Sequence, residues 1–460
     1  MRSPFPVVER TSRLPASAEA VWAWHQRPGA FERLVPPWER VEIVQRSGGL
    51  ADGGEVVAQV HAGPLTFRWV ARHRDYQPGR QFVDEQVEGP FTQWVHTHRI
   101  VPDGPQSSFL TDRIEYATPY GVAGAAADLW IVRRKIERML AYRHALLRDD
   151  LAAHARAALP PLHIAVTGAS GLLGRALTAF LTTGGHCVTP LVRRAARAGE
   201  IQWDPAAGRL EPSALEGVDA VVHLAGENLA GGRWTAERKR RILASRAQGT
   251  ALLARTLAGL ARPPRVLVSA SGVGIYGDRG DELLRDNAAP GPATDFLVQV
   301  VQAWESATEP ARNAGIRVAL PRFGAVLSPA GGALRKLVPV FQLGLGGRIG
   351  SGRQWMSWIS IDDAVGLLHH AIATESLSGA FNGVAPVPVR NAEFAATLGR
   401  VLGRPARLPV PAAALRAVFG EMAQETVLAS QRAVPDRAVQ SGYIYRQPTL
   451  EQALRFVLGR

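Results

Sequence analysis

The chain has 460 residues, more than one ordinary domain holds, so two or three domains are expected. Hydrophobic residues make up 46% and charged residues 20%, a composition typical of a globular protein with enough apolar material for its cores. Lysine and arginine outnumber aspartate and glutamate by 53 to 40. The arginines are spread along the whole chain and no nucleic-acid recognition motif accompanies them, so nucleic acid is not expected as a partner.

A single cysteine, Cys187, excludes an internal disulfide and a zinc site built from cysteines. No apolar run approaches the roughly 20 residues of a membrane-spanning helix. The N-terminal sequence "MRSPFPVVERTSRLP" lacks the apolar core of a signal peptide. A cytoplasmic protein without a membrane span is therefore expected. His163, His223, His369 and His370 show no metal-ligand spacing, so no metal is expected, and His223, inside an apolar strand, is expected to be a core imidazole.

Residues 1–158 are predicted to form a first domain of antiparallel strands closed by a helix. Short, largely alternating runs separated by Gly, Pro and Asp predict strands at 55–63, 65–76, 81–89, 91–102 and 107–119. Apolar residues at helical spacing then predict a long helix from Ala126 to Ala157. A long helix against a curved sheet is an α+β helix-grip arrangement, whose interior is usually an apolar cavity.

The opening stretch "ERTSRLPASAEAVWAWHQRPGAFERLVPPWERVEIV" resembles the START-like superfamily of polyketide cyclases/dehydrases and lipid-transport proteins. That resemblance implies an apolar ligand, or a lipid, inside the first domain. The candidate lining residues are tryptophans, although for any single one of them a place in the core is the preferred interpretation: Trp22, Trp24, Trp38, Trp69 and Trp94.

Pro160 and Pro161 end the long helix and mark a domain boundary. Beyond them, strand and helix patterns alternate, which predicts an α/β domain with a doubly wound parallel sheet of the Rossmann type over 162–384. Its strands are predicted at 162–168, 186–192, 220–226, 265–271 and 317–327. Short helices punctuated by proline predict a small helical C-terminal domain over 385–460 that packs on the Rossmann domain.

The stretch "IAVTGASGLLGRAL" (164–177) ends a predicted strand and opens a predicted helix. Its glycines follow a G-x-x-G-x-x-G spacing. We expect Gly168 to permit the tight turn, Gly171 to let the backbone approach a pyrophosphate, and Gly174 to let the helix pack close to the sheet. The pyrophosphate of a dinucleotide would then lie at the N-terminus of the helix, where N–H groups and the helix dipole favour anions.

The end of the second strand indicates which dinucleotide is bound. An NAD site usually carries Asp or Glu there, to hold the ribose 2′-hydroxyl. Here the stretch "PLVRRAARAGE" places Arg193 and Arg194 at that position, and Arg175 directly follows the glycine turn. A guanidinium can bind a 2′-phosphate that a carboxylate would repel, so NADP is favoured over NAD.

The motifs "VTGASGLLG", "VDAVVHLAGE" (218–227) and "SASGVGIYGD" (269–278) resemble the extended short-chain dehydrogenase/reductase family, which includes nucleotide-sugar epimerases and dehydratases. Longer stretches, among them "LAGENLAGGRWTAERKRRILASR" and "LGLGGRIGSGRQWMSWISIDD", are similar to an epimerase-like subfamily, in which a START-like domain is a known N-terminal fusion. The motifs and the resemblance together give the expected cofactor-binding residues: Gly168, Ser170, Gly171, Leu172, Leu173, Gly174, Arg175, Arg193, Arg194, Leu224, Ala225, Gly226 and Arg322.

The chain departs from the wider family at the residues that transfer protons. The family uses a Tyr-x-x-x-Lys pair, in which the lysine lowers the pKa of the tyrosine. Within "DFLVQVVQAWESA", Phe296 or Leu297 stands where the tyrosine belongs, and Val300 or Val301 where the lysine belongs. The family mechanism therefore cannot be transferred to this chain.

Other residues are candidates for the chemistry. Tyr276 follows the fourth strand and is expected to point into the cleft as a proton donor, with Ser271 beside it. The expected substrate-binding residues follow the third strand or lie in a glycine-rich stretch: Asn228, Arg233, Arg353 and Trp355.

Three readings of the function stay open, one of which, a lipid carrier with an inert partner domain, rests only on the first domain. Of the two others, one is an NADP(H)-dependent, epimerase-like oxidoreductase acting on a carbonyl, alcohol or sugar-nucleotide-like small molecule. The other is a non-catalytic NADP(H)-binding or sensing protein. The missing Tyr-x-x-x-Lys pair favours this non-catalytic reading, whereas the polar and arginine positions expected to line the cleft favour the enzyme, which is the leading interpretation. The sequence does not fix the oligomeric state.

Overall fold

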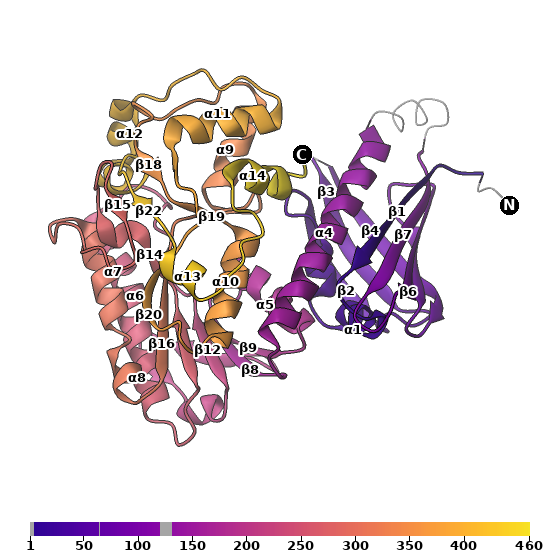
Figure 1. Cartoon of the computed structure of the whole chain (residues 1–460), viewed down its shortest axis with the longest axis horizontal. Coiled ribbons are helices and arrows are strands. Elements are labelled where there is room, and N and C mark those ends of the chain that lie inside the picture. Colours follow the sequence, from indigo (N-terminus) through magenta and orange to yellow (C-terminus); the bar gives the residue numbers. More distant parts are fainter. Residues whose placement is uncertain (1–3, 64, 120–130) are drawn as a thin grey trace. The chain divides into compact units, whose positions relative to one another are not determined.

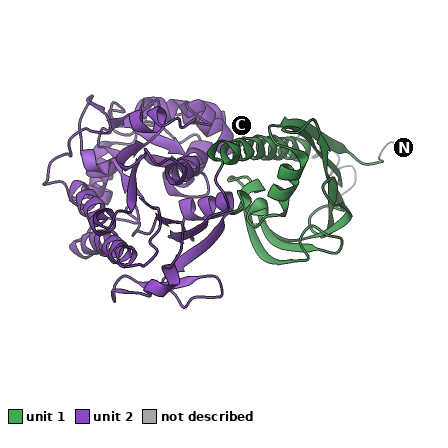
Figure 2. Cartoon of the chain, turned by 60° about the horizontal axis from the view of Figure 1, so that its bottom comes forward, with its two compact units in different colours: residues 1–158, 182–185, 459 green, residues 159–181, 186–458, 460 purple. Residues whose placement is uncertain are grey.

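The structure, a computed structural model, describes residues 4–63, 65–119 and 131–460. The chain divides into two compact units, shown in two colours in Figure 2. Unit 1 comprises residues 1–158, 182–185 and 459, and unit 2 comprises residues 159–181, 186–458 and 460.

Unit 1 is a seven-stranded antiparallel sheet with the order β1-β7-β6-β5-β4-β3-β2. Its strands are β1 (Val7–Leu14), β2 (Arg40–Ser47), β3 (Glu55–Ala62), β4 (Leu65–Gln77), β5 (Gln81–Glu88), β6 (Gln93–Pro102) and β7 (Ser108–Ala117). Its helices are α1 (Ala18–Gln26), α2 (Ala30–Leu34) and α4 (Arg133–Ala157), and α4 runs along the curved sheet in Figure 1. The predicted helix-grip arrangement is confirmed, while the first residues of the predicted long helix, 126–130, lie outside the described residues.

Alternation along the strands decides which side chains face the interior of unit 1. In β6, every second side chain from Trp94 to Ile100 is buried, and β7 buries the same kind of row from Ser108 to Tyr116. Helix α4 buries Ile136, Leu140, Leu147 and further residues at helical spacing. The interior therefore lies between this helix and the inward face of the sheet.

Unit 2 contains a nine-stranded, mainly parallel sheet with the order β11-β10-β9-β8-β12-β13-β16-β14, in which β20 also pairs with β16. Its strands are β8 (His163–Thr167), β9 (Cys187–Val192), β10 (Ile201–Asp204), β11 (Arg209–Leu210), β12 (Ala220–His223), β13 (Val266–Ser269), β14 (Ser271–Gly272), β16 (Arg317–Phe323) and β20 (Gly379–Gly383). The doubly wound parallel sheet is confirmed. The predicted strand 317–327 is divided, because β17 (Ala325–Leu327) leaves this sheet and pairs with β19 (Trp358–Ser360).

The chain winds away from β8 in both directions: β9 and β10 lie on one side of it, and β12, β13, β16 and β20 on the other. The strand order reverses between β8 and β12, which is where doubly wound sheets bind their ligands. Among the longer helices of this unit are α5 (Leu172–Thr183), α6 (Ala236–Ala258), α7 (Phe296–Ser306), α9 (Gly332–Gln342) and α10 (Ile361–Ala373), and a short helix α8 (Glu309–Asn313) follows α7 (Figure 1).

Apart from the 12-residue helix α11 (Asn391–Leu402), the C-terminal part of unit 2 consists of short elements. Its other α-helices are α12 (Ala412–Phe419), α13 (Asp436–Gln440) and α14 (Leu450–Leu458). The two-residue strands β21 (Val389–Arg390) and β22 (Arg432–Ala433) belong to the same part, and they pair with β18 (Trp355–Met356) and β15 (Leu283–Leu284) from earlier in the chain. Buried residues of α11 and α14 share one apolar core with α9 and β19. The boundary predicted at 384/385 stays a prediction.

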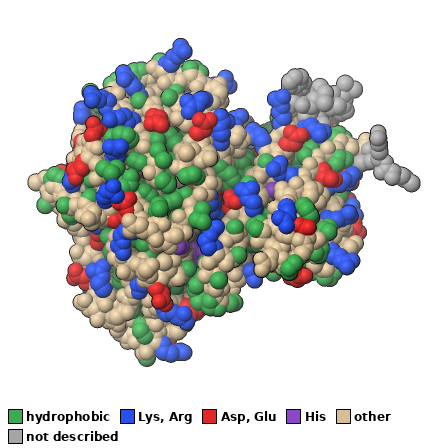
Figure 3. Space-filling view, in the orientation of Figure 1, with side chains coloured by type: hydrophobic (Ala, Val, Ile, Leu, Met, Phe, Trp, Pro, Cys, Tyr) green, Lys and Arg blue, Asp and Glu red, His purple; other side chains and the backbone are tan. Residues whose placement is uncertain are grey.

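Charged side chains are mixed on the surface. In the view of Figure 3, Lys and Arg are scattered, with Asp and Glu among them. Among the described residues, no helix combines the length and the apolar character that crossing a membrane requires.

Candidate functional site

The glycine turn between β8 and α5 lies where the strand order reverses. Gly168 has φ of +70°, and a Cβ there would lie 2.8 Å from the carbonyl carbon of Leu224, just past β12. A Cβ on Gly174 would lie 2.1 Å from the carbonyl oxygen of Gly168. Any side chain at either position would therefore separate β8 from β12 or α5 from the turn. The first turn of α5, which starts at Leu172, leaves N–H groups without partners in the helix, and these are suited to a phosphate.

A buried hydrogen-bond network fixes the ends of β8 and β12. Thr167 Oγ1 accepts the backbone N–H of Leu224 at 3.1 Å and that of Ala225 at 3.2 Å. It also lies 2.7 Å from His223 Nδ1, whose Nε2 lies 2.9 Å from Thr250 Oγ1. Both ring nitrogens of His223 thus have partners, and the prediction of a core imidazole is confirmed. Burial lowers the pKa of His223 to about 4.

Two arginines at the end of β9 differ in their contacts. Arg194 makes a bidentate ion pair with Glu200 at 2.6 and 2.7 Å, which lowers the pKa of that carboxyl to about 2. Arg193 is exposed, and within the described structure no side-chain contact engages it. Arg175 is also exposed, and its Nε donates to the carbonyl oxygen of Ser170 at 2.7 Å. The sequence analysis missed Glu200, which neutralises one of the two predicted phosphate ligands.

The loop after β12 and the segment before α9 lie beside the glycine turn. Leu224 and Ala225 are half-buried and Gly226 is exposed. Lys336 in α9 donates to the carbonyl oxygen of Ala230 at 3.2 Å, and a Cβ on Gly331 would lie 3.1 Å from the Leu172 side chain. Residues far apart in sequence thus frame the turn.

Two of the predicted substrate-binding residues belong to this loop. Asn228 is exposed, and its Oδ1 accepts the backbone N–H of Ala230 at 3.0 Å. Arg233 is also exposed and lies against Gly420: a Cβ added to Gly420 would lie 3.2 Å from Arg233 Nε. Both side chains face solvent rather than the core.

Tyr276 lies in the core, which corrects the expectation that its ring points into the cleft. Its side chain is fully buried, and its hydroxyl donates to Asn382 Oδ1 at 2.7 Å while accepting from Arg322 Nη1 at 3.1 Å. Arg322 in turn makes a bidentate ion pair with Glu305, at 2.8 Å for each contact. Burial raises the pKa of Tyr276.

Ser271 and Arg322 belong to the same network. The Ser271 hydroxyl donates to Glu305 Oε1 at 2.6 Å. The guanidinium of Arg322, predicted to bind the cofactor, is committed to Glu305 and Tyr276, and its residue is 9% exposed. Both side chains brace β14 and β16 against α7, and neither is free to bind a ligand without breaking an internal contact.

The four positions where the wider family carries its tyrosine and lysine are core positions here. Phe296, Leu297, Val300 and Val301 are all less than 9% exposed and share one apolar cluster with Tyr276. The helix that presents the proton-transfer pair in the wider family therefore presents packing residues in this chain.

A group of arginines surrounds Trp355 in β18. The guanidinium carbons of Arg390 and Arg432 lie 4.6 and 4.5 Å from the indole ring, and the indole Nε1 donates to Asp281 Oδ1 at 2.8 Å. Arg353, two residues before Trp355, is exposed. Two guanidinium groups and one carboxylate thus gather around one aromatic ring. Because Arg390 pairs with that carboxylate at 3.1 Å, Arg432 and the exposed Arg353 are the cations left for an anion.

The tryptophans of unit 1 pack in its core. Trp22, Trp24 and Trp94 are buried, whereas Trp38 and Trp69 are half-buried. The same interior also holds buried histidine and aspartate side chains from β4 to β7 and α4. The expectation of an apolar interior is therefore corrected, because the interior of unit 1 is only partly apolar.

Comparisons with known proteins match three stretches of the chain to families. Residues 164–382 match the NAD dependent epimerase/dehydratase family. Residues 14–145 match the polyketide cyclase / dehydrase and lipid transport family, and residues 410–457 match a domain of unknown function, DUF1731.

Three known proteins illustrate the similarity. An epimerase family protein of Mycobacterium tuberculosis, MT2273, is 45% identical over 300 residues, which are 65% of this chain and 98% of that protein. The crystal structure of a nucleoside-diphosphate sugar epimerase from Corynebacterium glutamicum is 35% identical, with a TM-score of 0.81 over 98% of this chain and 90% of that one. The human epimerase family protein SDR39U1, crystallised with NADPH, is 37% identical, with a TM-score of 0.60 over 64% of this chain and 99% of that one.

Proposed function

Because the chain belongs to the NAD dependent epimerase/dehydratase family, we propose that unit 2 binds NADP(H) and acts as an oxidoreductase on a small anionic molecule that carries a carbonyl or alcohol group. The observation that carries this proposal is the glycine turn at the reversal of the strand order. A Cβ at Gly168 or Gly174 would meet backbone atoms, so these positions keep a backbone surface at the start of α5. That surface fits a pyrophosphate, which Ser170, Leu172 and Leu173 would contact through backbone N–H groups, while the N–H of Gly171 closes the turn on the carbonyl oxygen of Gly168 at 2.9 Å.

The preference for NADP rests on Arg193 and Arg175. Arg193 offers an exposed guanidinium at the end of β9, where a 2′-phosphate would lie. Arg175 adds positive charge next to the glycine turn, whereas Arg194 contributes less because Glu200 neutralises it. The human relative that was crystallised with NADPH supports the same preference. Leu224, Ala225 and Gly226 lie across the turn and would contact the adenosine half.

The residues around the turn suggest how a substrate is held. When bound, the nicotinamide supplies a hydride donor or acceptor. Asn228 and Arg233 extend from the loop after β12, and the arginines around Trp355 would hold an anionic part of the substrate, such as the diphosphate of a sugar nucleotide. The remaining candidates for proton transfer are Tyr276, Ser271 and water, and because both side chains are engaged in the core network, water is favoured.

A second function, NADP(H) binding without catalysis, is favoured by a specific observation. The positions of the missing tyrosine and lysine are filled by buried apolar side chains, and the hydroxyl of Tyr276 is saturated by Asn382 and Arg322. Such a protein would bind the cofactor and respond to it, without a group that exchanges protons with a substrate.

Titration of NADPH and NADH into the full chain tests the cofactor assignment. We expect NADPH to bind more tightly than NADH, and Arg193→Glu to weaken NADPH binding at least about tenfold, because it replaces a cation with a repelling carboxylate. Arg10→Glu, at an exposed position of β1 in unit 1, is the control with the same change in net charge. Equal binding of both dinucleotides, or an equal loss in both variants, contradicts the assignment.

Consumption of NADPH separates the two functions. An oxidoreductase oxidises NADPH in the presence of a suitable carbonyl compound, and screening should begin with anionic ones because of the arginines around Trp355. Tight NADPH binding without turnover across such a set favours the non-catalytic reading.

A further inference from the structure

The interior of unit 1 contains a row of histidines and aspartates that unit 2 does not use. In the antiparallel register, His73 of β4 lies opposite Asp84 of β5, and Asp84 lies opposite His96 of β6. His98, two residues along β6, lies opposite Asp112 of β7. Alternation points all five side chains to the inward face of the sheet, where the four other than Asp84 are less than 9% exposed.

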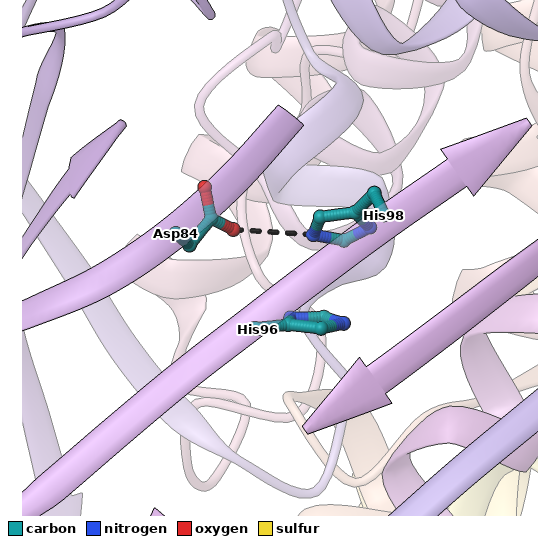
Figure 4. Close-up of side chains that lie close together, drawn as sticks. All are labelled: Asp84, His96 and His98. Atoms are coloured by element: carbon teal, nitrogen blue, oxygen red, sulfur yellow. Dashed lines mark hydrogen bonds and ion pairs between the residues drawn. The ribbon is translucent and has the colours of Figure 1, made fainter. Parts of the chain in front are cut away.

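Three of these side chains converge. Figure 4 shows Asp84, His96 and His98, which each offer one ligand atom, with all three atoms within 4.8 Å of one another. Asp84 Oδ2 and His98 Nε2 are 3.2 Å apart. Two ligands that each lie about 2.1 Å from one metal ion are roughly 3–4 Å apart, so a small adjustment of His96 completes the set.

We propose that Asp84, His96 and His98 bind a divalent transition-metal ion inside unit 1. Two imidazoles and one carboxylate are a ligand set that suits zinc and iron(II). Three protein ligands leave at least one coordination position for water or for an oxygen donor of a small ligand. The Asp84 side chain is 26% exposed, which gives the site a route to solvent.

The neighbours of the three ligands hold them as the outer shell of a metal site does. Asp112 Oδ1 lies 2.7 Å from His98 Nδ1 and would hold a proton there when Nε2, which faces Asp84, binds a metal. His73 Nε2 lies 2.9 Å from Asp84 Oδ1 and orients that carboxylate. The ring of Phe82 stacks on His98 at 4.2 Å between centroids, with 15° between the ring planes.

Within the described structure, ion pairs alone leave several buried polar atoms of this cluster without a hydrogen-bond partner, among them His73 Nδ1 and His96 Nε2. His96 is 2% exposed, and its Nε2 has no hydrogen-bond partner among the described residues, since the nearest carboxylate oxygen, on Asp112, is 3.7 Å away. A buried polar atom without a partner is costly. A metal ion coordinated by Nε2 of this ring would take the place of such a partner, and its charge would compensate the carboxylates of Asp84 and Asp112.

The spacing of histidines and carboxylates along the chain does not reveal this metal site, and the sequence analysis predicts no metal. The available signal is the alternation of His96 and His98 on one face of a strand. Asp84 and Asp112 join them only through the register of β5, β6 and β7, which the sequence does not specify by itself.

Metal titration of the full chain tests the proposal, using protein without a histidine tag that has been dialysed against a chelator. We expect about one equivalent of Zn²⁺ to bind by calorimetry. Co²⁺ as a probe should give visible absorption bands that Zn²⁺ abolishes. His96→Gln should weaken Zn²⁺ binding at least about 100-fold, whereas the control His144→Gln should change it by less than about tenfold. The control removes an imidazole that lies 3.1 Å from Asp112 but is not one of the three ligands.

The outcomes are decisive in both directions. Substoichiometric binding of Zn²⁺ to the wild type, or unchanged affinity in His96→Gln, overturns the proposal. If circular dichroism shows that His96→Gln does not fold, Asp84→Asn takes its place with the same expectation. If neither variant folds, Cu²⁺ on the wild type must show coupling to imidazole nitrogens by electron paramagnetic resonance, and its absence overturns the proposal.

Discussion

The side chain of Glu425 closes the N-terminus of α7 by accepting the backbone N–H of Leu297 at 2.7 Å. Its second carboxylate oxygen accepts the N–H of Phe296 at 3.1 Å. Asp295, the residue at the cap position, makes no side-chain capping bond. A carboxylate from the C-terminal part of the chain thus caps α7, the helix on which the wider family carries its tyrosine and lysine.

Removing this contact should destabilise unit 2. Glu425→Ala leaves two helix N–H groups without their acceptor and should lower the free energy of unfolding by about 1–2 kcal/mol. Gln424→Ala, at an exposed neighbouring position, is the control and should change it by less than about 0.5 kcal/mol. Urea denaturation followed by circular dichroism measures both. Equal effects would show that α7 does not depend on Glu425.

Restoring the lysine of the wider family should not restore its chemistry. Val301 is 2% exposed and packs in an apolar cluster, so Val301→Lys buries an ammonium group without a partner. We expect a loss of about 3 kcal/mol or more, against roughly 1–2 kcal/mol for the control Val301→Ala. Thermal unfolding and NADPH oxidation are the measurements. A stable Val301→Lys variant with gained turnover would mean that α7 opens toward the substrate.

The fold follows from patterns that are local in sequence. Alternating strands, a long helix at 3.6-residue spacing and the glycine turn are read from neighbouring residues, and the structure confirms both sheets. Contacts between distant residues could not be read in this way. Glu425 reaches α7 from about 130 residues away, and the buried pair of Arg322 and Glu305 depends on how β16 packs on α7.

In the candidate site, too, local features could be predicted from the sequence and contacts between distant residues could not. Gly168 and Gly174 could be predicted because each acts through its own backbone. The state of a side chain depends on its partners, so Arg193 and Arg194 look alike in sequence although only Arg194 is neutralised by Glu200. Tyr276 was expected near a ligand because it follows a strand, but the core closes around it.

Tyr276→Phe tests whether that hydroxyl is structural. The change leaves Asn382 Oδ1 and Arg322 Nη1 without their shared partner, and should lower the free energy of unfolding by about 1–2 kcal/mol with NADPH affinity unchanged. If an NADPH-dependent activity is found, its rate should change by less than about tenfold. A loss of 100-fold or more with unchanged stability is what general acid–base catalysis by Tyr276 would give instead.

Glu200→Gln should strengthen the binding of NADPH. The substitution removes the charge that neutralises Arg194 and leaves that guanidinium available to a 2′-phosphate. We expect the dissociation constant for NADPH to fall roughly three- to tenfold and that for NADH to change by less than twofold, with the gain shrinking in high salt. An equal gain for both dinucleotides would place Arg194 away from the 2′-phosphate.

His223 should make the stability of unit 2 depend on pH below neutrality. Its pKa is about 4 in the folded protein and about 6.5 in the unfolded chain. Between these values the unfolded chain binds the proton and the folded protein does not. The stability that the neutral imidazole of His223 contributes is therefore fully present above pH 6.5 and is lost as the pH falls toward 4.

The difference between wild type and His223→Gln isolates this effect, because other buried imidazoles contribute to both proteins. The advantage of the wild type in free energy of unfolding should shrink by about 2 kcal/mol between pH 7.5 and pH 5. Urea denaturation at the two pH values gives that difference. A constant difference would mean that His223 takes up its proton in the folded protein as readily as in the unfolded chain, which its bonds to Thr167 and Thr250 in the core argue against.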